Sequence, residues 1–110
     1  MRMWMVPPEI MCRRHLLGEH VELHMFAGTI KKGRSIDGFL DQRILEPYAI
    51  VQRHEALVAE MTRRGYNHKS PLVNPDSISK LERVTVDAEA SLKELLRRCP
   101  ECSELHLKHG

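Results

Sequence analysis

Apolar residues recur at helical spacing in three stretches of the chain, so the pattern predicts an all-α fold. The first stretch covers residues 11–32 and is closed by Gly33, a residue type that favours a helix end. Its apolar positions follow one another at intervals of seven, four and three residues, which places them on one buried face. They are Leu16, Leu23, Ala27 and Ile30.

The second stretch begins at Pro47, which suits the first turn of a helix, and ends at Gly65 after two arginines. Its predicted buried face consists of Ile50, Val51, Leu57, Val58 and Met61. The third stretch begins at Thr85 or Asp87, either of which can cap a helix, and Pro100 ends or kinks it. Its apolar positions are Leu92, Leu95, Leu96 and Cys99.

The segments between these helices are punctuated by Gly, Asp and Pro, and are predicted to be loops. A turn of helix is expected around Phe39–Ile44. Asp76 can cap a further short helix that runs to Leu81.

With 110 residues, the chain has the size expected of one small domain. Such a domain has room for one core and an open cleft, not for a deep pocket as well. No apolar run approaches the roughly 18 residues of a membrane helix, and we expect neither a membrane span nor a signal peptide. The three cysteines, with no secretory segment ahead of them, favour reduced thiols and a cytoplasmic location.

The net charge of +2 is unevenly distributed along the chain. Lys and Arg are in excess in residues 1–34 and 52–70, and these segments would form one positive face if they packed side by side. The basic residues concerned are Arg2, Arg13, Arg14, Lys31, Lys32, Arg34, Arg53, Arg63, Arg64 and Lys69. Because the calculated pI is only about 8.5, an ordinary solvated surface is the alternative interpretation.

One helix carries a polar stripe that differs from its apolar face. His15, Glu19 and Glu22 follow one another at spacings of four and three residues, so they share one side of the helix. An imidazole and two carboxylates at this spacing favour either acid–base chemistry or a solvated helix face. Trp4 is the only tryptophan, and we expect it in the core, not in base stacking.

Several segments resemble the phage pyrimidine-dimer DNA glycosylases of the endonuclease V type. The similarity lies in residues His15–Leu23, Gly28–Lys32 and Arg53–Asn67, in the same order as in that family. A weaker similarity to the third helix of the family lies in Glu89–Ser91 and Arg98.

This resemblance implies one compact domain, residues 1–110, with three main helices and an N-terminal segment threaded between them. It also implies a DNA glycosylase with AP lyase activity, which needs no cofactor and acts on double-stranded DNA with a damaged, modified or abasic nucleotide. In this family the N-terminal amine attacks C1′ of the deoxyribose, displaces the base and forms an imine, and β-elimination then cleaves the strand. Neither a membrane nor an obligate protein partner is implied.

Position by position, Glu22 matches the catalytic glutamate and Arg2 the arginine beside the nucleophile. Met1 then occupies the place of the nucleophilic residue, and Arg2 is too large for ordinary removal of the initiator methionine. An α-amine suits this role because its unperturbed pKa of about 7.7–8.0 leaves part of it neutral near pH 7. The remaining residues expected to contact DNA are Arg13, Arg14, His15, Lys31, Lys32, Arg34 and Arg98.

The sequence also departs from the family. Val21 and Met25 stand where the family has arginines that contact the DNA backbone. The candidates to compensate for them are His20, His24, Arg13 and Arg14. The C-terminal residues 100–110 lack the aromatic and lysine-rich tail of the family. The excised base therefore stays open, and a non-catalytic helical DNA-binding module is the alternative function.

A second group of residues has the chemistry of a metal site. Cys99, Cys102, His106 and His109 are all residue types that bind Zn²⁺, and each pair has ligand-like spacing. The gap between the pairs is much shorter than in a zinc finger, which argues against one shared ion. The alternatives are a small zinc-stabilised interaction protein, or a core Cys99 followed by a tail that is a frayed, flexible helix.

Overall fold

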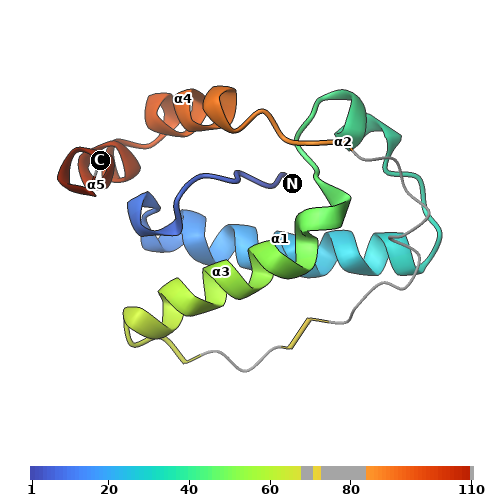
Figure 1. The fold of residues 1–110 in the computed structure, drawn as a ribbon, viewed down its shortest axis with the longest axis horizontal. Helices are drawn as coiled ribbons and strands as arrows, with labels where there is room; N and C mark the ends of the chain where they lie inside the picture. The colour runs from blue at the N-terminus through green and yellow to red at the C-terminus, as the bar shows by residue number, and fades with distance from the viewer. Residues whose placement is uncertain (68–70, 73–83, 110) are drawn as a thin grey trace.

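The computed structural model describes residues 1–67, 71–72 and 84–109, and within these residues it is all-helical, as predicted (Figure 1). The helices are α1 (Arg13–Lys31), α2 (Asp37–Asp41), α3 (Ile50–Arg63), α4 (Ala88–Arg98) and α5 (Pro100–His109), with 3-10 turns η1 (Pro8–Ile10) and η2 (Pro47–Ala49). None of the described helices is long and apolar enough to cross a membrane. The short helix predicted from Asp76 to Leu81, and Lys69, lie outside the described residues.

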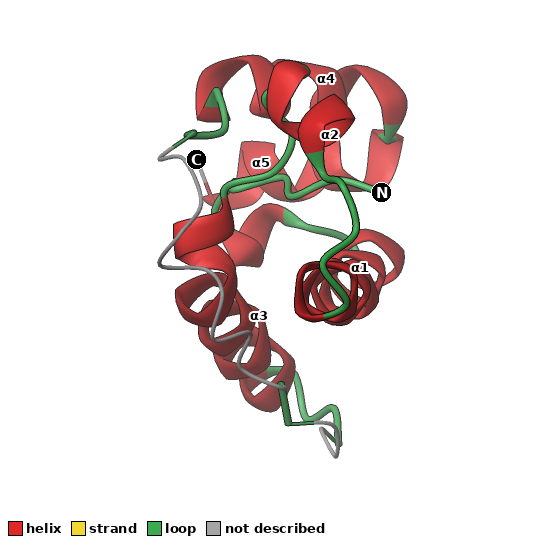
Figure 2. Cartoon of the chain, turned by 90° about the vertical axis from the view of Figure 1, so that its right-hand side faces the viewer, coloured by secondary structure: helices red, strands yellow, loops and turns green. Residues whose placement is uncertain are grey.

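The N-terminal segment runs between two groups of helices, which confirms the predicted threading. Figure 2 shows α1 and α3 on one side of this segment and α2, α4 and α5 on the other. The backbone N–H of Met3 donates to the carbonyl of Ile44 at 2.7 Å. The hydroxyl of Ser91 in α4 donates to the carbonyl of Trp4 at 2.5 Å.

The core forms around this segment from the predicted apolar faces. All four apolar positions of the first stretch are buried in α1: Leu16, Leu23, Ala27 and Ile30. In α3, Ile50, Leu57 and Met61 are buried as predicted, whereas Val51 is 40% exposed and its predicted burial is wrong. The buried positions recur at intervals of seven and four residues. Val51 is exposed because it directly follows Ile50, and successive residues of an α-helix are turned by about 100°.

Two predicted glycine stops end α1 and α3. Gly33 and Gly65 have φ angles of 70° and 83°, in the left-handed region that other residues adopt only with strain. After α3, the amide of Tyr66 donates to Met61 O at 2.8 Å and that of Gly65 to Thr62 O at 2.9 Å, the paired bonds of a Schellman motif. At the start of α4, Asp87 caps the helix by accepting from the amide of Ala90 at 3.1 Å.

The segment after Pro100 is helical, as predicted, but it is packed on the fold instead of frayed. It forms the helix α5, which packs on α4 and on η1. Pro100 ends α4 as predicted, but it also occupies the first position of α5, where its missing N–H costs nothing. Cys102 is fully buried and fixes α5 to the rest of the core.

Candidate active site

A pocket of about 380 Å³ lies beside the N-terminus. Its walls come from the N-terminal segment, α1, the connection after α2, and the end of α4. The lining residues are Met1, Arg2, Trp4, His15, Glu22, Gln42, Ile44 and Arg98. A second hollow of about 400 Å³ continues from it and shares Arg2, Gln42 and Ile44.

The carboxylate of Glu22 faces the beginning of the chain. Its Oε2 accepts a hydrogen bond from the backbone N–H of Arg2 at 3.4 Å. Met1 is 40% exposed at the mouth of the same pocket. The fold thus brings together Met1, Arg2 and Glu22, which the resemblance had grouped as one site.

The guanidinium of Arg2 is held between two groups. It lies 4.1 Å from the ring centre of Trp4, and its Nη2 donates to the hydroxyl of Ser91 at 3.3 Å. Burial lowers the pKa of Arg2, and the nearby Arg98 lowers it further. Trp4 is only 4% exposed, which confirms its predicted place in the core. The contact of Ser91 with Arg2 could not be predicted from local sequence, because the two residues are 89 positions apart.

Glu19 does not share the site with Glu22, contrary to the predicted polar stripe. It is 1% exposed, and its carboxylate accepts from Arg53 Nε at 2.6 Å and Nη2 at 2.8 Å. A third guanidinium nitrogen, Nη1, donates to the carbonyl of Val6 at 2.7 Å. The pair therefore fixes the N-terminal segment to α1 and α3 and has a structural role.

Three arginines of the predicted positive face are paired with carboxylates, and the predicted exposure of Arg53 is wrong. Arg53 is buried with Glu19, while Arg63 and Arg64 both bind the carboxylate of Glu60. Arg64 also donates to the carbonyl of Met11 at 2.7 Å. The hydrogen bond from Arg63 lowers the pKa of Glu60; burial opposes this shift, and a hydrogen bond from Arg64 adds to it.

Of the other predicted DNA contacts, Arg13, Arg14, Lys31, Lys32 and Arg34 are exposed, but those on α1 and at its C-cap lie on different sides of the helix. One stripe of residues on the helix surface lies beside Glu22. It consists of Arg14, Val21, Met25 and Lys32, which follow one another at intervals of seven, four and seven residues. Val21 and Met25 are 55% and 50% exposed. Arg13 and Lys31 are each nine residues from Glu22, which is two and a half turns and therefore the opposite side of the helix. Arg13 stacks there on Tyr66, at 4.9 Å from the ring centre.

His20 and His24 do not take the place of the missing arginines. Their rings pack against His54 of α3, with centroid distances of 4.9 and 5.1 Å respectively. His20 and His54 are 7% and 2% exposed. This histidine group belongs to the contact between α1 and α3.

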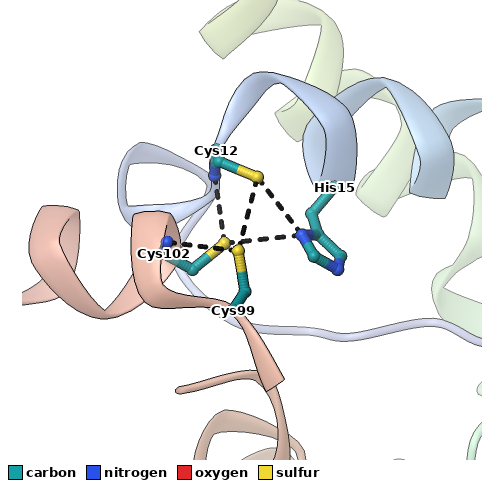
Figure 3. Close-up of side chains that lie close together, drawn as sticks. All are labelled: Cys12, His15, Cys99 and Cys102. Atoms are coloured by element: carbon teal, nitrogen blue, oxygen red, sulfur yellow. Dashed lines mark hydrogen bonds between the residues drawn. The ribbon is translucent and has the colours of Figure 1, made fainter. Parts of the chain in front are cut away.

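Cys99 and Cys102 gather with metal-ligating groups, but not with His106 and His109. Their partners are Cys12 and His15, and all four ligand atoms lie within 4.8 Å of one another (Figure 3). No group of potential ligands in the described residues includes His106 or His109. The sequence did contain a signal for this group, since Cys12 and His15 have the same two-residue gap as Cys99 and Cys102.

His15 also lines the pocket. Burial lowers the pKa of this residue, and Arg14 and Arg98 act in the same direction.

Comparison with known proteins agrees with this geometry. The family described as pyrimidine dimer DNA glycosylase matches residues 1–74, more than half of the 110-residue chain. The match includes Met1, Arg2 and Glu22, whereas Cys99 and Cys102 lie beyond it. No curated protein and no solved structure gives a match. On the extent of the family match, the chain belongs to the pyrimidine dimer DNA glycosylases, a family of DNA-repair enzymes.

Proposed function

We propose that the protein removes a damaged or modified base from double-stranded DNA and cleaves the strand at the resulting site, with the amine of Met1 as nucleophile. The observation that carries this proposal is the shared pocket of Met1, Arg2 and Glu22, in which the Glu22 carboxylate is 3.4 Å from the amide of Arg2. An N-terminal amine beside a carboxylate is a suitable pair for imine chemistry.

In the proposed reaction, the neutral amine attacks C1′ and the bond from C1′ to the base breaks, so the base leaves with the bonding electrons and takes up a proton. The C1′–O4′ bond then opens with protonation of O4′ to give the imine. Loss of a proton from C2′ expels the 3′-phosphate in β-elimination, and water hydrolyses the imine to release the amine. Glu22 stabilises the cationic sugar and moves these protons.

The Arg2 guanidinium is expected to orient a phosphate at the pocket. Its contacts with Trp4 and Ser91 fix its position before DNA binds, which reduces the entropy lost on binding. Because the Arg2 guanidinium is partly removed from water, it should bind a phosphate oxygen more strongly than a fully solvated arginine would. Arg98 also lies near the Trp4 ring, 5.8 Å from its centre, and forms an ion pair with Glu94 at 2.6 Å.

The DNA is expected to lie along the α1 stripe beside Glu22. Arg14 and Lys32 are 18 residues apart, and at 1.5 Å per residue they are separated by about 27 Å along the helix axis. Val21 and Met25 between them present apolar side chains to the DNA where the family presents arginines. Apolar side chains can insert between unstacked bases, so we infer that this chain favours lesions that already weaken stacking.

Borohydride trapping tests the nucleophile. Protein with a free Met1 amine, verified by mass spectrometry, and the same protein with an acetylated N-terminus are incubated with duplex DNA containing one abasic site. We expect a reduced covalent adduct only with the free amine. Adducts with both proteins would assign the imine to a lysine and overturn the role of Met1. Absence of any adduct would overturn the imine mechanism.

The alternative function is a non-catalytic DNA-binding module, and the replacement of two family arginines by Val21 and Met25 favours it. A variant that lacks the Glu22 carboxylate distinguishes this module from the enzyme. Glu22→Gln should reduce strand cleavage by a hundredfold or more, on the order of other acid–base residues, while DNA binding is retained. Glu89→Gln, an exposed carboxylate on α4, is the control and should leave cleavage unchanged. Equal cleavage by the wild type and Glu22→Gln would contradict the proposed role of Glu22.

A further inference from the structure

The side chains of Cys12, His15, Cys99 and Cys102 converge on one point from two distant parts of the chain (Figure 3). Cys12 and His15 lie at the start of α1, whereas Cys99 and Cys102 lie at the junction of α4 and α5. All three thiols are buried, and none is in a disulfide. We propose that this group is a structural zinc site that joins the start of α1 to the α4–α5 junction.

Of three distances between ligand atoms, two lie within about 0.1 Å of those around a tetrahedral ion and one is about 0.4 Å shorter. With Zn–S near 2.3 Å and Zn–N near 2.0–2.1 Å, tetrahedral geometry requires about 3.8 Å between two sulfurs and about 3.6 Å between sulfur and nitrogen. The Sγ atoms of Cys12 and Cys99 are 3.7 Å apart. His15 Nδ1 lies 3.2 Å from Cys12 Sγ and 3.7 Å from Cys102 Sγ.

The orientation of His15 distinguishes this group from cysteines that merely fill the core. A buried free cysteine behaves as a small apolar residue and does not require an imidazole nitrogen beside it. In Figure 3 the Nδ1 of His15 points at the three sulfurs and the other ring nitrogen points away. The ring also packs edge-on against Trp4, with a centroid distance of 5.8 Å. One nitrogen is therefore held toward the sulfurs, as in a metal-bound histidine.

Backbone amides around the sulfurs supply a second layer of support. The N–H of Cys12 donates to Cys102 Sγ at 3.1 Å, and the N–H of Cys102 donates to Cys99 Sγ at 3.4 Å. Hydrogen bonds of this kind stabilise thiolates and orient them toward an ion. Two ligand pairs, each with a two-residue gap, give the composition Cys₃His, which is a common structural zinc set with no open position.

The site would serve the active pocket without taking part in its chemistry. His15 and Arg98 line the pocket, and each belongs to or directly adjoins the ligand group. A zinc ion would hold these residues in place and would keep α4, with Ser91, against the N-terminal segment. This explains how a chain of 110 residues can stabilise both a core and a pocket.

Metal content of the wild-type protein, purified under reducing conditions without chelator or a histidine tag, is the first test. We expect about one zinc ion per chain, as a closed four-ligand site binds a single ion. After exchange, Co²⁺ should give the visible bands of tetrahedral coordination and a near-ultraviolet thiolate charge-transfer band. No bound zinc together with an octahedral Co²⁺ spectrum would overturn the proposal, and so would a disulfide between any two of the cysteines.

Variants identify the ligands. Cys12→Ser and Cys102→Ser should each lose stoichiometric zinc, with circular dichroism to report whether the helices persist. The matched control is the double variant His106→Asn, His109→Asn, which should retain zinc and the Co²⁺ spectrum. Loss of zinc in this control would instead support the set with His106 and His109. Because the readout is metal content and not DNA cleavage, the result is independent of the proposed function.

Discussion

The charged side chain of Arg53 joins α3 to α1 and to the N-terminal segment. It forms a buried, two-point ion pair with Glu19 and also binds the carbonyl of Val6. Arg53→Met leaves the Glu19 carboxylate buried without a counter-charge, and we expect a loss of about 3–5 kcal/mol in the free energy of unfolding. Urea denaturation measures this loss.

The exposed Arg63 on the same helix is the control for this experiment. The Arg63 side chain is 61% exposed and Glu60 keeps its ion pair with Arg64, so Arg63→Met should destabilise the fold much less than Arg53→Met. The double variant Glu19→Leu, Arg53→Met removes both buried charges and should recover part of the loss. If Arg53→Met were no more destabilising than Arg63→Met, the assigned structural role of the pair would be wrong.

Glu60 gives the fold a pH dependence on the acid side. Its pKa is held below the ordinary value of 4.5 by hydrogen bonds from Arg63 and Arg64. A lowered pKa in the folded state contributes stability above the unfolded pKa, and this contribution is lost as the pH falls through the folded value. Between about pH 6 and about pH 3, the unfolding free energy of the wild type should therefore fall more steeply than that of Glu60→Gln. Parallel curves from chemical denaturation would contradict this.

At the scale of elements, α4 depends on its cap. Asp87 accepts from the amide of Ala90, and α4 carries Ser91 and Arg98 to the pocket. Asp87→Ala should lower the unfolding free energy by about 1 kcal/mol, whereas Asp87→Ser keeps a capping oxygen and should lose much less. Thermal unfolding of the two variants is the measurement. Equal destabilisation by Ala and Ser would show that the cap is not the source of the effect.

The elements also show what a sequence can and cannot predict. The boundaries of α1 and α3 follow from apolar spacing and from Gly33 and Gly65, because these signals are local. The sequence predicts a frayed helix after Pro100 but not the packing of α5, since α5 is held by the burial of Cys102 against a residue 90 positions away. Local sequence cannot indicate such a contact.

The same reasoning applies to the two glutamates of the polar stripe. Glu19 and Glu22 are three residues apart on α1 and have similar local surroundings in sequence. Only Arg53, 34 positions further on, decides that Glu19 is buried in an ion pair while Glu22 faces the pocket. The grouping of Met1 with Glu22 came from the family resemblance, since periodicity alone contains no information on where an extended N-terminal segment lies.

At the scale of the whole molecule, the distribution of charge determines how salt affects DNA binding. The double variants Arg14→Gln, Lys32→Gln and Arg13→Gln, Lys31→Gln each remove two positive charges, so each reduces the formal net charge of +2 to zero. Only the first pair lies on the Glu22 side of α1. Because each phosphate contact contributes about 0.9 to the slope of log K against log salt, the first variant should lose about 1.8 in slope and the second close to none.

Fluorescence anisotropy with a labelled duplex over a series of salt concentrations measures these slopes. The two variants are matched in net charge and differ only in the side of α1 that is changed. Equal slopes would mean that DNA binding follows the net charge of the molecule and would contradict the proposed DNA-binding side.

The cysteine–histidine group also determines how the molecule responds to a pulling force. Cys12 and Cys99 are 87 residues apart in sequence, but their sulfurs are 3.7 Å apart, so the group closes a loop that contains most of the chain. When the two ends of the chain are pulled apart, the force acts on this cysteine–histidine group before it acts on the residues between 12 and 99. With a metal ion bound there, only the N-terminal segment and the end of α5 can be extended first. The contour length stored between residues 12 and 99 is then released in one event, when the metal–ligand bonds break.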